Sequence, residues 1–265
     1  MHSIHRAIGW AAIVFFGALA GLAHADGTFD SVKGQVRMTD SKGIEMAASK
    51  ETAILPGSTI TTGADSQAVL RFNDGSAVVL NQNTTFRVVD YEYDPAKPGV
   101  GRSVFDFLKG AARFVTGLIA RAEPANYKLR TPQATIGVRG TDFSLASGSL
   151  YISVVHGVVT ATNAAGTVAF GAGQFGFIGT AATLPAAIGA GQLPAGVAGS
   201  FTQLGVVPLP AGTLPPPAGG EAFGAGEATG AAGGASGATA AAIVGAGLGA
   251  AVLSNYKSST TTTHH

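Results

Sequence analysis

Short apolar stretches with a period of two residues recur between residues 27 and 178, and turn residues separate them. The clearest example is residues 67–80, where Ala68, Leu70 and Phe72 fall on one face of an extended strand. Successive side chains of a strand point to opposite faces, so this period is typical of a half-buried β-strand. The pattern predicts an all-β domain over residues 26–179.

An Asp-Gly turn interrupts that stretch at Asn73-Asp74-Gly75-Ser76. Glycine accepts the positive φ that a tight hairpin requires, so the turn predicts a β-hairpin. Further strand-like runs cover residues 84–89, 104–108, 127–131, 141–145, 150–155 and 158–162. Only residues 109–121 could make a short helix, although Gly110 and Gly117 weaken it. Many short strands at close spacing predict an antiparallel β-sandwich or a jelly-roll-like domain.

The chain changes character after Gly179. Only Glu221, Glu227 and Lys257 are charged there, and proline recurs. Such a segment buries too little apolar surface to offset its ordering entropy, so residues 180–265 are predicted to be a disordered Gly/Ala/Pro-rich tail. The apolar run at residues 240–253 is shorter than the roughly 20 residues of a membrane span. It could form an interfacial helix that associates with the envelope, but it predicts no firm transmembrane helix.

The N-terminus has the three parts of a secretory signal. Residues 1–6 carry positive charge, residues 7–22 are apolar and uncharged, and Ala23-His24-Ala25 supplies small residues for cleavage. The sequence therefore predicts a signal peptide at residues 1–25, a mature chain that begins at Asp26, and a periplasmic or secreted protein. An uncleaved N-terminal anchor is the alternative.

Composition removes several kinds of chemistry. The chain has no cysteine, which excludes disulfides, thiolate nucleophiles and Cys-based metal sites. Its net charge of +1 favours neither nucleic acid nor a membrane surface. Residues 26–179 contain one histidine, His156, and no Gly-x-Ser-x-Gly elbow. Carboxylate groups such as Asp40 and Glu45, or Asp90, Glu92 and Asp94, are typical of solvated strand faces. We therefore expect no enzymatic activity, no cofactor, no metal site and no nucleic-acid partner.

One block of residues is specific: Thr131-Pro132-Gln133-Ala134-Thr135-Ile136-Gly137-Val138-Arg139-Gly140-Thr141-Asp142-Phe143. With Thr62-Gly63, residues 72–76 and Lys109-Gly110, it resembles the FecR family of periplasmic domains over residues 59–160. The resemblance implies an extracytoplasmic β module that recognises another envelope protein or a surface ligand. Regulatory members of that family are anti-sigma proteins with a cytoplasmic segment. Here only the predicted signal peptide precedes the domain, so we expect no direct contact with a sigma factor.

The same block has a physical interpretation of its own. Pro132 cannot donate to a sheet ladder, so a strand should end there. Gly137 and Gly140 bracket a tight corner, and Arg139 between them could bind freed carbonyls or, alternatively, a ligand or partner. The candidate interface residues are Thr131, Pro132, Gly137, Arg139, Gly140, Thr141 and Phe143.

Charge is distributed unevenly within the domain. Residues 109–139 contain six basic side chains and one acid, Glu123, whereas residues 40–94 contain eight acids and four bases. These charges could simply solvate strand faces. Alternatively they form a basic patch for an envelope protein, an anionic glycan or a lipid headgroup, with candidates Lys109, Arg113, Arg121, Lys128 and Arg130.

Two functions remain open at this point. The first is a binding or sensory module of the cell envelope. The second is a structural or surface-displayed protein that its Gly/Ala-rich tail tethers.

Overall fold

The computed structural model describes residues 26–214. The predicted signal peptide at residues 1–25, the apolar run at residues 240–253 and the rest of the predicted tail beyond residue 214 lie outside the described residues.

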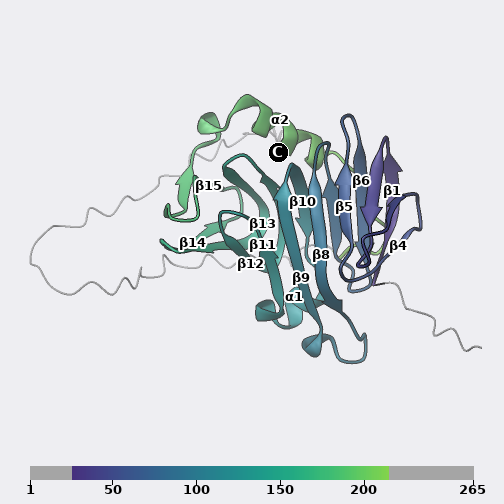
Figure 1. Ribbon diagram of the computed structural model, residues 1–265. Coiled ribbons are helices and arrows are strands. Elements are labelled where there is room, and N and C mark those ends of the chain that lie inside the picture. The colour runs from purple at the N-terminus through teal and green to yellow at the C-terminus, as the bar shows by residue number, and fades with distance from the viewer. Residues whose placement is uncertain (1–25, 215–265) are drawn as a thin grey trace, which may run out of the picture. The chain divides into compact units, whose positions relative to one another are not determined.

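The described chain is mostly β (Figure 1). Its first eight strands are β1 (Gly27–Lys33), β2 (Val36–Thr39), β3 (Glu45–Ala47), β4 (Ala53–Ile54), β5 (Thr59–Thr62), β6 (Gln67–Phe72), β7 (Ala77–Leu80) and β8 (Thr85–Glu92). The next eight are β9 (Arg102–Lys109), β10 (Ala111–Val115), β11 (Tyr127–Arg130), β12 (Thr135–Ala146), β13 (Leu150–Asn163), β14 (Gly166–Gly171), β15 (Phe175–Ile178) and β16 (Ala186–Ile188). The helices are α1 (Leu118–Ala122) and α2 (Ala195–Gly205), with 3-10 turns η1 (Pro98–Val100), η2 (Pro124–Asn126) and η3 (Ala190–Gln192).

All of these strands belong to one continuous, strongly curled sheet. Most of them follow the order β3-β2-β5-β8-β9-β11-β12-β10-β7-β6-β1-β4, and β13 extends the sheet from β12 to β14, β15 and β16. Strands β9 and β11 run parallel, so the sheet is mixed. The predicted β content is confirmed, but the prediction of an antiparallel sandwich or jelly roll is wrong, because the hydrogen-bond ladder passes unbroken from one side of the core to the other.

The long hairpin β12–β13 makes that passage. The first part of β12 pairs with β11, and the part from Asp142 onward pairs with β10. Hence β12 leaves one group of strands and enters another. We call β3, β2, β5, β8, β9 and β11 the first arm, and β10, β7, β6, β1 and β4 the second arm.

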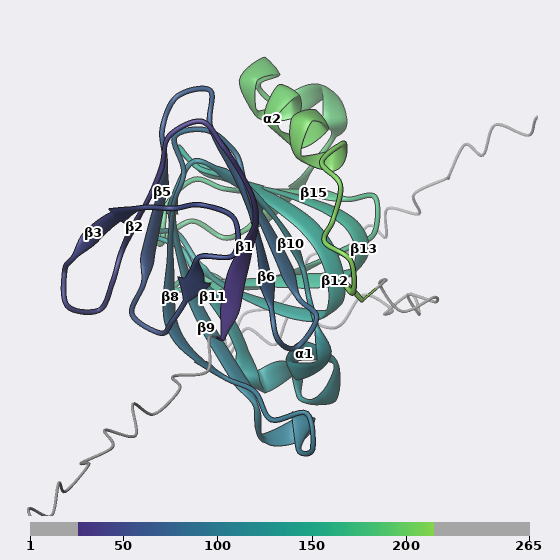
Figure 2. The ribbon, with the colours of Figure 1, turned by 90° about the vertical axis from the view of Figure 1, so that its right-hand side faces the viewer.

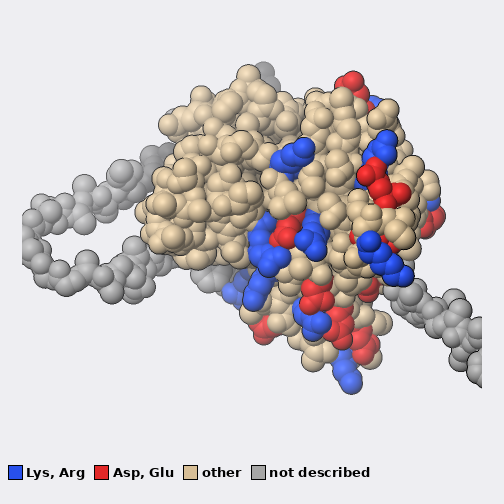
Figure 3. Space-filling view, in the orientation of Figure 1, with Lys and Arg blue, Asp and Glu red and all other residues tan. Residues whose placement is uncertain are grey.

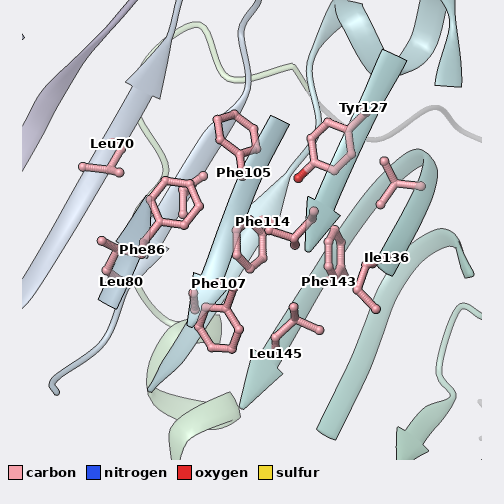
Figure 4. Close-up of a cluster of buried hydrophobic side chains, with 14 of the residues drawn as sticks. Leu70, Leu80, Phe86, Phe105, Phe107, Phe114, Tyr127, Ile136, Phe143 and Leu145 are labelled. Atoms are coloured by element: carbon pink, nitrogen blue, oxygen red, sulfur yellow. The ribbon is translucent and has the colours of Figure 1, made fainter. Parts of the chain in front are cut away.

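The apolar faces of the two arms meet in the core (Figure 4). Phe72 of the second arm lies 5.3 Å from Phe105 of the first, measured between ring centroids, and Phe86 and Phe114 are separated by 6.0 Å. Aromatic pairs at such separations add to the free energy gained from burial alone. Contacts between aromatic rings of the two arms therefore stabilise the packing of one arm against the other.

Two local predictions had different outcomes. The hairpin at residues 67–80 is confirmed as β6 and β7, and Gly75 adopts φ +79° in the turn. The suggested helix at residues 109–121 is largely wrong. Residues 111–115 form β10, because Ala112 and Phe114 alternate into the core, and only residues 118–122 form a helix.

The prediction that disorder begins at residue 180 is wrong for residues 180–214. Strand β16 pairs with β15, and α2 packs on the outer face of the second arm (Figure 2). Leu204 is fully buried there, and Val197 and Phe201 pack beside it. Their spacing of four and three residues places all three on one side of a helix. The prediction of disorder rested on composition, which does not reveal this short amphipathic pattern.

Candidate functional site

The outer face of the first arm carries a row of charged side chains in register. Arg87 on β8 lies opposite Asp106 on β9, and Asp106 lies beside Arg130 on β11. The strand period of two residues turns all three away from the core, because Phe86, Phe105 and Leu129 next to them are buried. Adjacent strands lie about 4.8 Å apart, so the single carboxylate sits between two guanidinium groups.

Of these two guanidinium groups, that of Arg130 forms an ion pair with Asp106. The Nε of Arg130 donates to Asp106 Oδ1 at 2.7 Å, and the Arg130 side chain is 50% exposed. That hydrogen bond raises the pKa of Arg130, and the attraction to the carboxylate adds to it. Arg87 is exposed on the other side of Asp106. The row therefore keeps a surplus of positive charge.

Two more cations extend the row. Lys128 occupies the preceding outward position of β11, and Arg139 occupies an outward position of β12. Both are exposed. We call Arg87, Asp106, Lys128, Arg130 and Arg139 together the cationic face. In Figure 3 blue side chains gather around red over β8 and β9, whereas the region over β13, β14 and β15 is free of either colour.

Arg113 does not belong to this face. Its Nε and Nη2 donate to the two carboxylate oxygens of Asp142 at 2.8 and 2.6 Å, on the outer side of the second arm. The side chains of Arg113 and Asp142 are only 12% and 4% exposed. The hydrogen bond to Asp142 raises the pKa of Arg113 although burial opposes this. The Arg113 guanidinium is therefore paired with Asp142 within the domain.

The other candidates of the predicted patch are spread over the domain. Arg121 lies on α1, where burial lowers its pKa although Asp74 acts in the opposite sense. Lys109 is exposed at the end of β9. The structure therefore brings only Lys128 and Arg130 together. Arg87, which the prediction missed, could have been found from its outward position in the expected strand at residues 84–89.

The Thr131-Pro132 segment forms the turn between β11 and β12. The Oγ1 of Thr131 accepts hydrogen bonds from the backbone N–H of Ala134 at 3.0 Å and of Gln133 at 3.3 Å. Strand β11 ends at Arg130, in agreement with the restriction that Pro132 imposes. Pro132 itself is exposed, and Thr131 is partly buried.

The glycines of the specific block lie within a strand and not at a loop corner. Gly140 adopts φ +58° at a bulge where the β12–β13 register shifts, which is where the sheet passes between the arms. Gly137 lies in the regular ladder opposite Thr160. Thr141 and Phe143 are buried: the N–H of Thr141 donates to Thr116 Oγ1 at 2.8 Å, and Phe143 stacks on Phe114. Within this block, Arg139 has an exposed, charged side chain.

Residues 26–214 show no arrangement typical of a catalytic triad or a metal centre. His156 on β13 is exposed and lies opposite Asp142 of β12. Among residues 26–214 it makes no hydrogen bond to a serine hydroxyl. The described residues contain no cluster of three metal-ligating side chains. Within the same range no helix has both the length and the hydropathy to cross a membrane.

These features define a curled, mostly β domain with a charged outer face on one arm. Residues 58–160 match the family described as FecR protein, so the chain contains a FecR domain. The match begins at β5 and extends into β13. The strands β14–β16 and helix α2 lie outside it.

Two crystal structures of a "putative anti-sigma factor" from Parabacteroides distasonis, at 2.50 and 1.65 Å resolution, are similar to the chain at 18% sequence identity and a TM-score of 0.40. Each alignment covers 49% of this chain and 58% of the other, so the chain spans less than two thirds of the length of these structures. No protein with a curated description matches the chain.

Proposed function

We propose that this chain is an exported recognition module of the cell envelope, and that its cationic face docks an anionic partner. The observation that carries the proposal is the positive charge around Asp106, whose carboxylate lies between Arg87 and Arg130, with Lys128 at the preceding outward position beside Arg130. Arg87 on β8 and Lys128 and Arg130 on β11 flank the intervening strand β9 in one hydrogen-bonded sheet, so the backbone fixes their spacing before a partner arrives. Such preorganisation lowers the entropic cost of binding.

The chemistry of the face suits an extended anion. Guanidinium groups bind carboxylate, sulfate or phosphate oxygens in a planar, bidentate geometry. Arg130 is half exposed and already oriented by Asp106, and Arg87 flanks the same carboxylate.

Neutralisation of three cations tests the proposal. The full chain with Arg87→Gln, Lys128→Gln and Arg130→Gln should lose at least tenfold in affinity for its anionic ligand at low salt, and wild-type binding should weaken as ionic strength rises. The probes are heparin, vesicles that contain phosphatidylglycerol, and an envelope protein extract, which separate glycan, lipid and protein sources. The readout is the binding isotherm at several salt concentrations.

The matched control changes the same amount of charge elsewhere. Arg37→Gln, Lys42→Gln and Lys50→Gln replace three exposed cations outside the cationic face. This control should bind each probe as the wild type does. Equal loss in both triple variants would show that net charge matters and the cationic face does not, which would overturn the proposal.

Export rests on the sequence of residues 1–25 and is part of the same proposal. Mass spectrometry of protein recovered from the envelope fraction should give a mature chain that begins at Asp26. Recovery of the uncleaved chain in the cytoplasm would contradict it.

A second candidate function is that of a structural, surface-displayed protein. The observation in its favour is that residues 143–214 contain no Asp, Glu, Lys or Arg, so β13–β16 and α2 present a neutral surface. Cell fractionation distinguishes the two functions. A product retained in the outer membrane or matrix through residues after 179 supports display, whereas a releasable product with one bound partner supports recognition.

A further inference from the structure

Strand β14 forms an open edge of the sheet (Figure 1). It is one of four strands at which the sheet ends, together with β3, β4 and β16, and within residues 26–214 it pairs only with β13. With six residues it is the longest of the four, because the others have two or three. It lies outside the stretch that matches the FecR family, so the family match does not account for this edge.

The hydrogen-bond pattern leaves the outer side of β14 open. In an antiparallel ladder, successive residues direct their N–H and carbonyl groups alternately toward the paired strand and away from it. The N–H of Gly171 points away from β13, because it donates to the side-chain Oε1 of Gln174 at 2.7 Å. Thr167 and Ala169 lie two and four positions before it, so their N–H and carbonyl groups also point away. The hydroxyls of Thr162 and Thr167 lie 2.9 Å apart across the ladder, as expected for a pair without mutual backbone hydrogen bonds.

The other three end strands have features that prevent a sheet edge from pairing. Strand β3 is short and contains Glu45, and β4 is shorter still and lies between Glu51 and Pro56. Strand β16 directly follows Pro185. Charge, proline and shortness are usual means by which proteins keep an edge from pairing with another copy of themselves. Strand β14 contains neither charge nor proline, and its ladder with β13 has no bulge, so this edge alone of the four is unprotected against a second copy.

A second copy of β14 matches this edge across a two-fold axis. In an antiparallel pair centred on Val168, Thr167 of one copy lies opposite Ala169 of the other, and the outward N–H and carbonyl groups of these residues bond to each other. Val168 then faces its counterpart. It packs at the rim of the core and is only partly buried, so the pairing removes more of its apolar surface from water. Residues 143–214 contain no charged side chain, so two copies meet here without charge repulsion.

We propose that β14 is a self-association edge, through which two copies of the chain pair antiparallel with Val168 on the two-fold axis. The two curled sheets then join into one. A single pair of short strands buries less than the roughly 1,200–2,000 Å² of a standard interface, so the dimer is weak and forms as the concentration rises. The edge is independent of the cationic face, whose residues lie on β8, β9, β11 and β12.

Disulfide crosslinking tests the register of the pair. The chain has no cysteine, so a single introduced thiol reports on this contact alone. Under mild oxidation the full chain with Val168→Cys should form a covalent dimer, because facing Cα atoms of such a pair lie about 4.5 Å apart, within the range of a disulfide. Thr167→Cys should crosslink roughly tenfold more slowly, because its two thiols occupy diagonal positions about 7–8 Å apart. Non-reducing gel electrophoresis measures both rates.

Added charge tests the pairing without a crosslink. Thr167→Lys with Ala169→Lys places like charges opposite each other in the dimer, at positions that are exposed in the single chain. In sedimentation velocity at rising concentration, this variant should raise the dissociation constant of the dimer at least about tenfold. Its circular dichroism should match the wild type, so that loss of the dimer is not loss of the fold. The matched control is Ala96→Lys with Ala125→Lys, which adds the same charge at exposed positions outside β14 and should dimerise as the wild type does.

The edge and the cationic face can fail separately, because Lys128→Gln with Arg130→Gln should leave dimerisation unchanged. A wild-type chain that stays monomeric at every concentration would overturn the proposal, and so would equal crosslinking of Val168→Cys and Thr167→Cys. Oxidation of the Val168→Cys chain in an envelope extract gives a further outcome against it, namely a disulfide to another protein with none between two copies.

Discussion

At the residue scale, Asp74 shows how one buried carboxylate organises several elements. It is 2% exposed, and its Oδ1 accepts hydrogen bonds from the N–H and hydroxyl of Ser76 and from the Tyr91 hydroxyl. Its Oδ2 accepts from the N–H of Ile119 at the start of α1. Burial, reinforced by the charge of Asp74, raises the pKa of Tyr91. The hairpin turn thus also anchors α1 and a strand of the opposite arm.

The bend of the sheet gives a sharp prediction at this scale. A Cβ on Gly157 would come within 2.5 Å of the Gly140 carbonyl oxygen, and Gly157 adopts φ +79°. Gly157→Ala should therefore lower the free energy of unfolding by roughly 1 kcal/mol for the backbone conformation and about 1–3 kcal/mol more for the close contact. Urea denaturation measures the change.

Gly173 provides the matched control, because it has the same φ of +79° and nothing within 4 Å of its Cβ position. Gly173→Ala should show only the smaller, conformational loss. If both variants lose the same stability, the close approach at the bulge is not what requires glycine there.

Some of these residue roles could be predicted from the sequence. The others depend on contacts between residues that are distant in the sequence. Pro132 and the Asp74-Gly75 turn act through local backbone geometry, so their signals are local. The pairing of Arg113 with Asp142 joins residues that are 29 positions apart in the sequence, and it depends on a register shift at Gly140 that no local pattern encodes. A basic residue that faces a buried acid looks like a surface cation in the sequence, so the sequence alone places Arg113 in the predicted basic patch.

At the element scale, the contribution of α2 to stability can be tested apart from that of the core. Leu204 is its one fully buried side chain, whereas Val206 just beyond it is 77% exposed. Leu204→Ala should loosen α2 by about 2–5 kcal/mol, the usual cost of truncating a buried leucine. Limited proteolysis between residues 193 and 209 should become faster, while the core strands keep their amide protection.

Val206→Ala is the control, and it should change the cleavage rate little, because exposed substitutions usually fall within about 0.5 kcal/mol. Unfolding of the whole domain by Leu204→Ala would contradict the separability of α2.

Element types were easier to predict than their pairing. The alternating patterns at residues 84–89 and 104–108 correspond to β8 and β9 because side-chain period is a local property. The predicted strand at residues 141–145 is part of the longer β12, and the predicted strands at residues 150–155 and 158–162 form the single strand β13. The bulge at Gly140 and the positive φ of Gly157 allow each of these strands to continue through a bend. A sequence with glycines at such points is easily interpreted as strands that end there.

At the scale of the whole molecule, the boundary of the folded unit is testable. The last described residues reach back to the β6–β7 turn, where the N–H of Leu214 donates to the Gly75 carbonyl at 3.2 Å. A fragment of residues 26–214 should therefore unfold at the same temperature as the mature full chain. A fragment of residues 26–179 lacks α2 and uncovers Val69, Val79 and Ala146, so its midpoint should fall by several degrees.

Calorimetry of the two fragments and the full chain makes the comparison. Equal midpoints for both fragments would place the boundary at residue 179 and would show that α2 adds no stability. A lower midpoint for residues 26–214 than for the full chain would show that residues beyond 214 contribute to the fold.

The alternation of the chain between the two arms has a consequence for how the protein is made. Strand β9 lies in the first arm, β10 in the second and β11 in the first again, beside β9 in parallel. Neither half of the sheet can be completed by neighbouring segments alone, because β12 must arrive before β11 and β10 share a common strand. A nascent chain that ends before about residue 146 would thus lack the complete β12, and its two arms would stay unjoined. The sheet would then close late and in a single step. If the chain is exported as we propose, such delayed closure keeps it in a form that a translocation channel can accept.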